Sequence, residues 1–210
     1  MCDLKKIAIC GAHGTGKTQI YEKVINYWVS EDRSDYNVFS RGTVAVIPEQ
    51  FRDVVKDISN FTKQTEEVTL ATYGKQLYLE NLYTAQGKNI LCDRSVLDTF
   101  IYYDYFNKRL LERSIFLDSN TTECNVVICK WIQRFIDCAK EDCKKYSKIY
   151  LIEPSDREIE NDNFRMTDKK QQLEIHKLFL EYFKDFDNVV IVNQEKQNEI
   201  AEMIINNFNI

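Results

Sequence analysis

The stretch from Gly11 to Thr18 reads GAHGTGKT and fits the phosphate-binding pattern G-x-x-x-x-G-K-[ST]. Glycines in such a loop let backbone N–H groups turn toward phosphate oxygens, and a following helix N-terminus adds positive potential. The Lys17 ammonium would reach the β- and γ-phosphates, and the Thr18 hydroxyl would bind Mg²⁺. These residue types at this spacing predict a binding site for a nucleoside triphosphate with magnesium.

The elements around this motif are those that a phosphate-binding loop needs. Lys5 to Cys10 predicts a short strand before it, and the periodic stretch Gln19 to Trp28 predicts a helix after it. His13 occupies a variable position of the pattern, and we expect it to face solvent. The predicted cofactor-binding residues are Gly11, Ala12, His13, Gly14, Thr15, Gly16, Lys17 and Thr18.

The rest of the chain alternates short apolar runs with helical patterns, which predicts a parallel sheet covered on both faces. The expected fold class is α/β, a three-layer P-loop NTPase fold with a five-stranded parallel sheet and a short lid at 155–168, in a single domain 1–210. Further strands are expected at 44–47, 89–92, 148–152 and 188–192, and further helices at 51–59, 67–86, 96–112, 122–145, 169–185 and 195–208.

Polar residues follow the ends of four predicted strands. Gly11, Glu49, Asp93 and Glu153 each stand at such a position. Because ligands of parallel α/β sheets bind at the carboxyl ends of the strands, we expect these four residues to line one rim.

Asp93 and Arg94 form a second candidate site beside the phosphate-binding loop. A carboxylate there can hold Mg²⁺ or accept a proton from an attacking hydroxyl, and an arginine can contact phosphates. In the alternative interpretation, Asp93 caps the next helix and Arg94 is a surface ion-pair partner.

Four motifs in this order resemble a family of small P-loop nucleoside and nucleotide kinases. They read GAHGTGKT, IPEQFRD, ILCDRSVLDTFIYYDYF and ENDNFR, and the resemblance runs from residue 5 to about residue 205. The chain is similar to the ribosylnicotinamide kinase domain of bifunctional NAD-biosynthesis regulators and to the related AAA-like ATPase/kinase group. Deoxynucleoside kinases share the [DE]-R-S signature more distantly.

The resemblance implies catalytic roles for Lys17, Asp93, Arg94 and Arg165, and a metal site at Thr18 and Asp93. It places Glu49 on the acceptor side, with Arg52 one helical turn away. Asp98 matches an acidic position of the family, although solvation of a helix face explains it equally well. Arg165 would close over the transferred phosphoryl group, in a lid motif where Asn163 replaces the family's glycine.

Several other polar and aromatic residues are assigned structural positions. We expect Gln76 and Glu80 to lie on a solvated helix face; in the alternative interpretation they read an acceptor base through hydrogen bonds. His176 is expected to pack at the edge of the core. Packing is also the preferred interpretation of Tyr102, Tyr103, Tyr105 and Phe106.

Composition excludes some classes of function. The net charge of −5 argues against a surface that binds a nucleic-acid duplex. Seven cysteines without a C-x-x-C pair, and only two histidines, give little support for a zinc site. No apolar run is long enough to span a bilayer, so we expect a cytoplasmic protein without a membrane partner. A homodimer is left open.

Three functions remain in view. The first is transfer of the γ-phosphoryl group of ATP to a small nucleoside-like acceptor. The second is a nucleoside monophosphate kinase, which would use arginines such as Arg41, Arg52 and Arg94 in its acceptor pocket. The third is a regulatory ATPase or switch. Against a GTPase-like switch, the run that begins at Asn107 lacks the aspartate of an N-K-x-D motif.

Overall fold

The computed structural model describes residues 4–31, 44–57, 65–114, 122–156 and 168–208 of the chain. A five-stranded parallel sheet has the order β2-β3-β1-β4-β5. Its strands are β1 (Lys6–Cys10), β2 (Val44–Ile47), β3 (Asn89–Asp93), β4 (Lys148–Glu153) and β5 (Val189–Asn193). The expected five-stranded α/β fold is therefore confirmed, and so are the positions of its strands.

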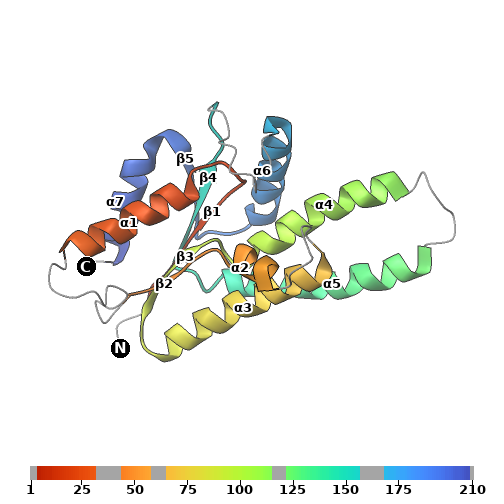
Figure 1. The fold of residues 1–210 in the computed structure, drawn as a ribbon, viewed down its shortest axis with the longest axis horizontal. Coiled ribbons are helices and arrows are strands. Elements are labelled where there is room, and N and C mark those ends of the chain that lie inside the picture. The colour runs from red at the N-terminus through yellow and green to blue at the C-terminus, as the bar shows by residue number, and fades with distance from the viewer. Residues whose placement is uncertain (1–3, 32–43, 58–64, 115–121, 157–167, 209–210) are drawn as a thin grey trace.

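Helices connect the strands and cover both faces of the sheet (Figure 1). They are α1 (Lys17–Glu31), α2 (Gln50–Asp57), α3 (Glu66–Ala85), α4 (Asp98–Ser114), α5 (Thr122–Cys143), α6 (Lys169–Phe183) and α7 (Gln197–Phe208), with a short 3₁₀ turn η1 (Gln194–Lys196) before α7. Each predicted helix is present, with ends shifted by up to three residues. α1 begins inside the phosphate-binding motif, at Lys17, two residues before the expected start.

Alternation of side chains along the strands builds two hydrophobic cores, one on each face of the sheet. Ile7 and Ile9 of β1 point to the face that α1 and α7 cover, where Trp28 stacks edge-on against Phe208 at 5.5 Å. Ala8 and Cys10 point to the opposite face, which is covered by α3, α4, α5 and α6. This gives the expected three layers, and it leaves the ends of the strands for polar residues.

The carboxyl ends of β1 and β3 lie side by side. Ile9 pairs with Asp93, and on the other side of β1 Cys10 pairs with Leu151 of β4. This confirms that the first and third strands are neighbours. The loop that begins at Gly11 therefore starts next to Asp93.

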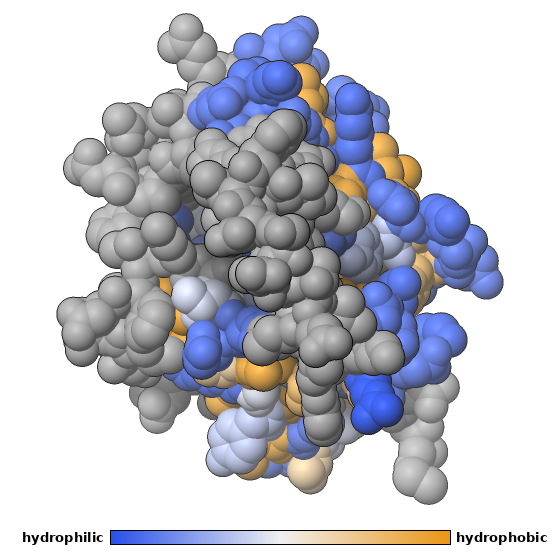
Figure 2. Space-filling model, turned by 90° about the vertical axis from the view of Figure 1, so that its right-hand side faces the viewer, coloured by the Kyte–Doolittle hydropathy of each residue, from blue (hydrophilic) through white to orange (hydrophobic). Residues whose placement is uncertain are grey.

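The face shown in Figure 2 is predominantly hydrophilic where its residues are described, with small hydrophobic areas between the charged ones. Among the described helices, none combines the length and the hydropathy that a membrane-spanning segment requires.

Candidate active site

The loop between β1 and α1 has the backbone conformation that its glycines permit. Gly11, Gly14 and Gly16 all have positive φ, at 138°, 70° and 78°. A Cβ atom at Gly11 would lie 2.7 Å from the carbonyl oxygen of Ile152 in β4. The loop therefore passes close against the neighbouring strand, and only glycine fits at that point.

One side chain of the loop and two from distant parts of the chain hold this loop by its carbonyl groups. The Thr15 hydroxyl donates to the carbonyl of Ala12 at 2.9 Å. The amide of Gln172, in the first turn of α6, donates to the carbonyl of His13 at 2.6 Å. The amide of Gln194 donates to the carbonyl of Gly14 at 3.4 Å. His13 is buried, so the expectation that it faces solvent is wrong, because α6 packs over this part of the loop.

Lys17 is buried at the start of α1 and lies against its own loop. Its ammonium donates to the carbonyl of Ala12 at 2.6 Å and contacts the Thr15 hydroxyl at 3.3 Å. Burial, together with the nearby charge of Arg94, lowers the pKa of Lys17 to about 7, although the carboxylates of Asp93, Asp98 and Glu49 act in the opposite direction. The charges of the two predicted sites therefore interact.

Asp93 and Arg94 form a tight turn at the end of β3. Arg94 has φ of 91°, an uncommon value for a residue with a side chain, and its N–H donates to the Ile9 carbonyl at 3.0 Å. The Asp93 side chain is buried, and burial raises its pKa to about 6. α4 begins only at Asp98, so the alternative in which Asp93 caps that helix is wrong.

Arg94 is at the centre of an ion-pair cluster. Its Nε donates to Glu49 at 2.6 Å, its Nη1 lies 3.5 Å from Asp98, and its guanidinium stacks 5.1 Å from the ring centroid of Tyr102. Arg52 contacts the other oxygen of Glu49 at 3.2 Å. Since the Arg94 side chain is only 17% exposed, its interpretation as a surface ion-pair partner is also wrong.

The two carboxylates on Arg94 are held differently. Burial alone would raise the pKa of Glu49, but the positive charges of Arg94, Lys17 and Arg52 outweigh it and the pKa lies below its usual value. Asp98 is almost fully buried and accepts the Ser95 N–H at 3.1 Å and the Ser95 hydroxyl at 2.7 Å. Solvation of a helix face therefore does not explain Asp98. Its carboxylate instead stabilises the turn that carries Arg94, through the hydrogen bonds to Ser95.

The predicted solvation of Gln76 and Glu80 on α3 is also wrong. Both side chains are buried, and both make hydrogen bonds inside the protein. The Gln76 amide donates to the carbonyl of Arg94 at 2.7 Å, so its donor atom is already engaged with the protein. The expectation for His176 is confirmed, since it is buried on α6.

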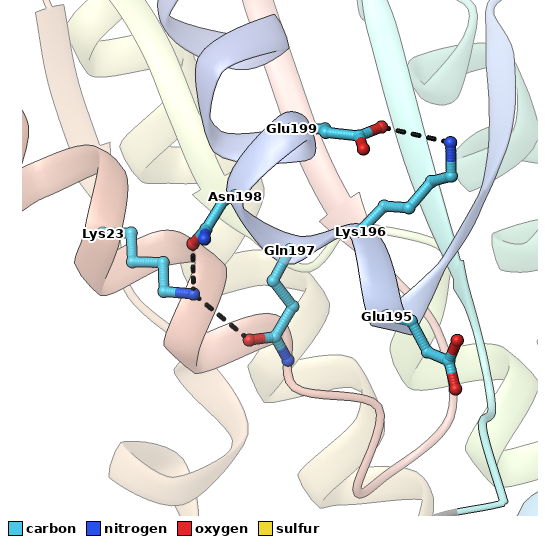
Figure 3. Close-up of a pocket in the computed structure, with 6 residues that line it drawn as sticks. All are labelled: Lys23, Glu195, Lys196, Gln197, Asn198 and Glu199. Carbon is cyan, nitrogen blue, oxygen red and sulfur yellow. Dashed lines mark hydrogen bonds and ion pairs between the residues drawn. The ribbon is translucent and has the colours of Figure 1, made fainter.

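A shallow pocket lies beside the loop, where the β5–α7 connection meets α1 (Figure 3). Lys23 of α1 donates to Asn198 at 2.8 Å and to Gln197 at 3.4 Å. Gln197 also approaches the loop, since a Cβ atom at Gly16 would meet its amide nitrogen at 2.4 Å. These contacts hold the start of α7 against the first turn of α1.

Some predicted site residues lie outside the described part of the chain. Arg165 and Asn163 belong to residues 157–167, and Arg41 belongs to residues 32–43. The ends that flank residues 157–167 are described. The Ser155 N–H donates to Gln194 at 3.0 Å, and the Lys169 ammonium donates to the Ser155 carbonyl. Asp168 caps α6 by accepting the N–H of Lys170 at 2.8 Å.

Sequence reasoning missed Gln172 and Gln194 altogether. Gln172 shares one face of α6 with the buried residues Ile175, His176 and Phe179, at helical spacing. That spacing is the signal that would have predicted its burial. Gln194 follows β5 at the same edge of the sheet as the other strand-end residues, and this position was its only signal.

The oxygen ligands at this edge of the sheet fit magnesium carried by ATP. Thr18 lies in the first turn of α1, and Asp93 ends the neighbouring β3. In the described ranges, no group of three or more His, Cys, Asp and Glu side chains is arranged to hold a metal. Mg²⁺ is usually bound by one or two protein oxygens together with substrate phosphates and water, so a hydroxyl and one carboxylate are a suitable donor set.

Comparison with solved structures finds the same fold in other proteins. The chain matches a structure of the NadR protein in complex with NR with a TM-score of 0.60 and 14% identity, covering 97% of this chain and 52% of that one. This chain therefore spans about half the length of that protein. It matches a thymidylate kinase from Ehrlichia chaffeensis with a TM-score of 0.56 and 15% identity, covering 98% of both chains.

Comparison with sequences gives the family. A search of curated proteins finds no match. The profile of an AAA domain family, AAA_28, matches residues 6–199, which include the phosphate-binding loop, the Asp93–Arg94 turn and the start of α7. The match covers nearly the whole sequence, and the chain belongs to this AAA domain family.

Proposed function

We propose that this chain transfers the γ-phosphoryl group of ATP, with Mg²⁺, to a hydroxyl of a small nucleoside-like acceptor. One observation carries the proposal: the phosphate-binding loop starts beside Asp93, since Ile9 pairs with Asp93, and the adjacent Arg94 binds Glu49 at 2.6 Å. Lys17 is the phosphate-binding residue of the loop. Carboxylates beside the transferred phosphoryl group are what an acceptor hydroxyl requires, since it has to lose its proton.

The roles follow from the contacts of each group. Lys17 and the loop bind the phosphates, Thr18 and Asp93 hold the metal, and Arg94 neutralises charge on the phosphoryl group during transfer. The magnesium supplies charge neutralisation between the β- and γ-phosphates when it is bound. Asp93, with a pKa of about 6, is ionised at neutral pH and can therefore hold the metal. Glu49 faces the acceptor and fixes Arg94.

The paired arginines favour a neutral acceptor over a nucleoside monophosphate. Glu49 already binds Arg94 and Arg52, at 2.6 and 3.2 Å. A phosphate dianion at this point would meet the Glu49 carboxylate, and like charges at close range repel. A sugar hydroxyl can instead donate a hydrogen bond to the same carboxylate.

The test is a transfer assay with Mg²⁺-ATP and a panel of nucleosides, ribosylnicotinamide and nucleoside monophosphates. We expect ADP formation that depends on a nucleoside-like acceptor. Glu49→Gln should lower kcat by about 100-fold and leave the affinity for ATP unchanged. This loss lies at the lower end of what a single proton-transfer or orienting group contributes to catalysis.

The other outcomes are equally informative. Turnover with monophosphates alone would replace the proposal by a monophosphate kinase, the activity named for the thymidylate kinase of the same fold. ADP formation that is independent of any acceptor would instead indicate the regulatory ATPase.

A further inference from the structure

A buried carboxylate on α3 lies directly behind the Asp93–Arg94 turn. Glu80 is 1% exposed. One of its oxygens accepts the Lys6 ammonium at 2.8 Å. The other accepts the Tyr146 hydroxyl at 2.5 Å and the Gln76 amide at 3.1 Å, with the Cys92 thiol at 3.7 Å. With this many donors the carboxylate is satisfied inside the protein, as a buried charge requires.

Two hydrogen-bond chains lead from Glu80 to the backbone on the C-terminal side of the turn. In the first chain, the Gln76 amide bonds to Glu80 and also donates to the carbonyl of Arg94 at 2.7 Å. In the second, the Tyr146 hydroxyl donates to Glu80 and accepts the N–H of Val96 at 3.2 Å. The carbonyl of Arg94 and the N–H of Val96 are thus both fixed by groups that share one anchor.

The turn that these two contacts follow is the part of the site that most needs support, and on its other side the Arg94 N–H donates to the Ile9 carbonyl. Arg94 has φ of 91°, a conformation that is strained for a residue with a side chain and persists only where its surroundings enforce it. This backbone conformation accompanies the 2.6 Å contact between the Arg94 Nε and Glu49.

We propose that Gln76 and Tyr146, tied together by Glu80, are positioning residues that hold the Asp93–Arg94 turn in its strained conformation and thereby place Arg94 on Glu49. The elements involved are far apart in the chain, since Tyr146 precedes β4 and the other two residues lie on α3. The anchor also binds Lys6 at the start of β1. The expected loss of phosphoryl transfer rests on the function proposed above, whereas the expected weakening of the contact between Arg94 and Glu49 does not.

The chain offers a matched control for this proposal. Tyr73 lies on α3 and is buried, and its hydroxyl donates to the Asp142 carboxylate at 2.9 Å. Tyr73→Phe and Tyr146→Phe therefore each remove one buried hydroxyl that is bonded to a carboxylate. Only Tyr146 also contacts the turn. A loss of general core stability affects both variants, whereas a loss of positioning affects Tyr146→Phe alone.

The experiment compares Gln76→Met, Tyr146→Phe and Tyr73→Phe in the full chain. Hydrogen exchange of the Arg94 Nε–H is measured by ¹⁵N NMR, because the contact with Glu49 protects that proton. We expect exchange to accelerate about tenfold in Gln76→Met and in Tyr146→Phe, the factor that one lost hydrogen bond is worth, and to stay at the wild-type rate in Tyr73→Phe. In the transfer assay, the same two variants should lose about 10- to 100-fold in kcat with KM for ATP unchanged.

The two readouts separate the failure of this proposal from failure of the proposed function. Wild-type exchange in both Gln76→Met and Tyr146→Phe would overturn the positioning role. So would an equal acceleration in Tyr73→Phe. If wild-type protein transfers no phosphoryl group to any acceptor, the proposed function fails, and the exchange measurement still decides whether Gln76 and Tyr146 hold the turn.

Discussion

Glu49 and Arg94 are separated by 45 positions in the chain and meet at 2.6 Å, where the ends of β2 and β3 lie next to each other. This contact joins the predicted acceptor side of the site to the predicted phosphate side. Because Lys17 lies within electrostatic reach of both residues, the protonation of one group affects the others.

Nucleotide binding should be accompanied by proton uptake at Lys17. Its pKa of about 7 leaves most Lys17 side chains neutral at pH 8, and phosphate oxygens beside the ammonium favour the charged form. We expect uptake approaching one proton per ATP, measured by calorimetry at pH 8 in buffers of different ionisation enthalpy. In Lys17→Arg the side chain is charged throughout, so the uptake should vanish. Lys17→Ala should reduce transfer by about 100-fold or more.

Asp93→Asn should stabilise the protein while it abolishes turnover. The folded pKa of Asp93 is about 6, above its ordinary value of 3.8, so its ionisation opposes folding above pH 6. We expect the free energy of unfolding in urea to rise by roughly 1–2 kcal/mol at pH 7.5, and the gain to become small at pH 3.5, where the carboxyl is mostly protonated in both states. If Asp93→Asn is instead less stable than the wild type at pH 7.5, the ionised Asp93 carboxylate stabilises the folded protein and the prediction is wrong.

His176 should contribute to the pH dependence of stability with a sign opposite to that of Asp93, because it lowers stability as pH falls. Burial lowers the pKa of His176, with the Glu153 charge acting against it. As pH falls through about 6.5, the unfolded chain takes up a proton before the folded one does, so stability decreases. In His176→Met this part of the decrease between pH 7.5 and 5.5 should be absent. Urea unfolding at both pH values measures it, and parallel curves for the two proteins would refute it.

Three glycine-to-alanine variants should separate steric clash from backbone strain. Gly11→Ala combines positive φ with a carbonyl at 2.7 Å, and we expect it to be the most destabilising. Gly87→Ala has φ of 71° but nothing within 4 Å, so only about 1 kcal/mol should be lost. Gly74→Ala, inside α3 and with nothing within 4 Å, should gain about 0.5–1 kcal/mol. Thermal unfolding of the three variants measures the order of their stabilities. Equal losses in Gly11→Ala and Gly87→Ala would mean that the Ile152 carbonyl in β4 moves away from the added Cβ atom.

The sequence predicted those features of the fold and site that local patterns encode. Apolar runs such as Val44–Ile47 define strands because a strand buried on both faces needs no alternation. The phosphate-binding loop is recognisable because its chemistry requires glycines and a lysine at fixed spacing. Asp93 could be placed beside it because parallel strands end at one edge of a sheet.

Buried polar residues were not predictable in the same way. Glu80 on a helix resembles any solvated glutamate, and its partners Lys6 and Tyr146 are 74 and 66 positions away. Gln172 and His13, which are also in contact, are separated by 159 positions in the chain. Such pairs depend on how helices dock on the sheet, and a single sequence carries little information about docking. The proposed role of Arg165 remains a prediction.

The glutamine contacts to the phosphate-binding loop also bear on the order of folding. Gln194 reaches Gly14 across 180 positions, and β1 is flanked by β3 and by the much later β4. During synthesis, therefore, the motif emerges first but its supports emerge near the end. A nascent chain that ends before β4 holds the complete GAHGTGKT sequence without a formed nucleotide site. ATP can accordingly stabilise the finished protein by mass action but gives no help to the early folding steps.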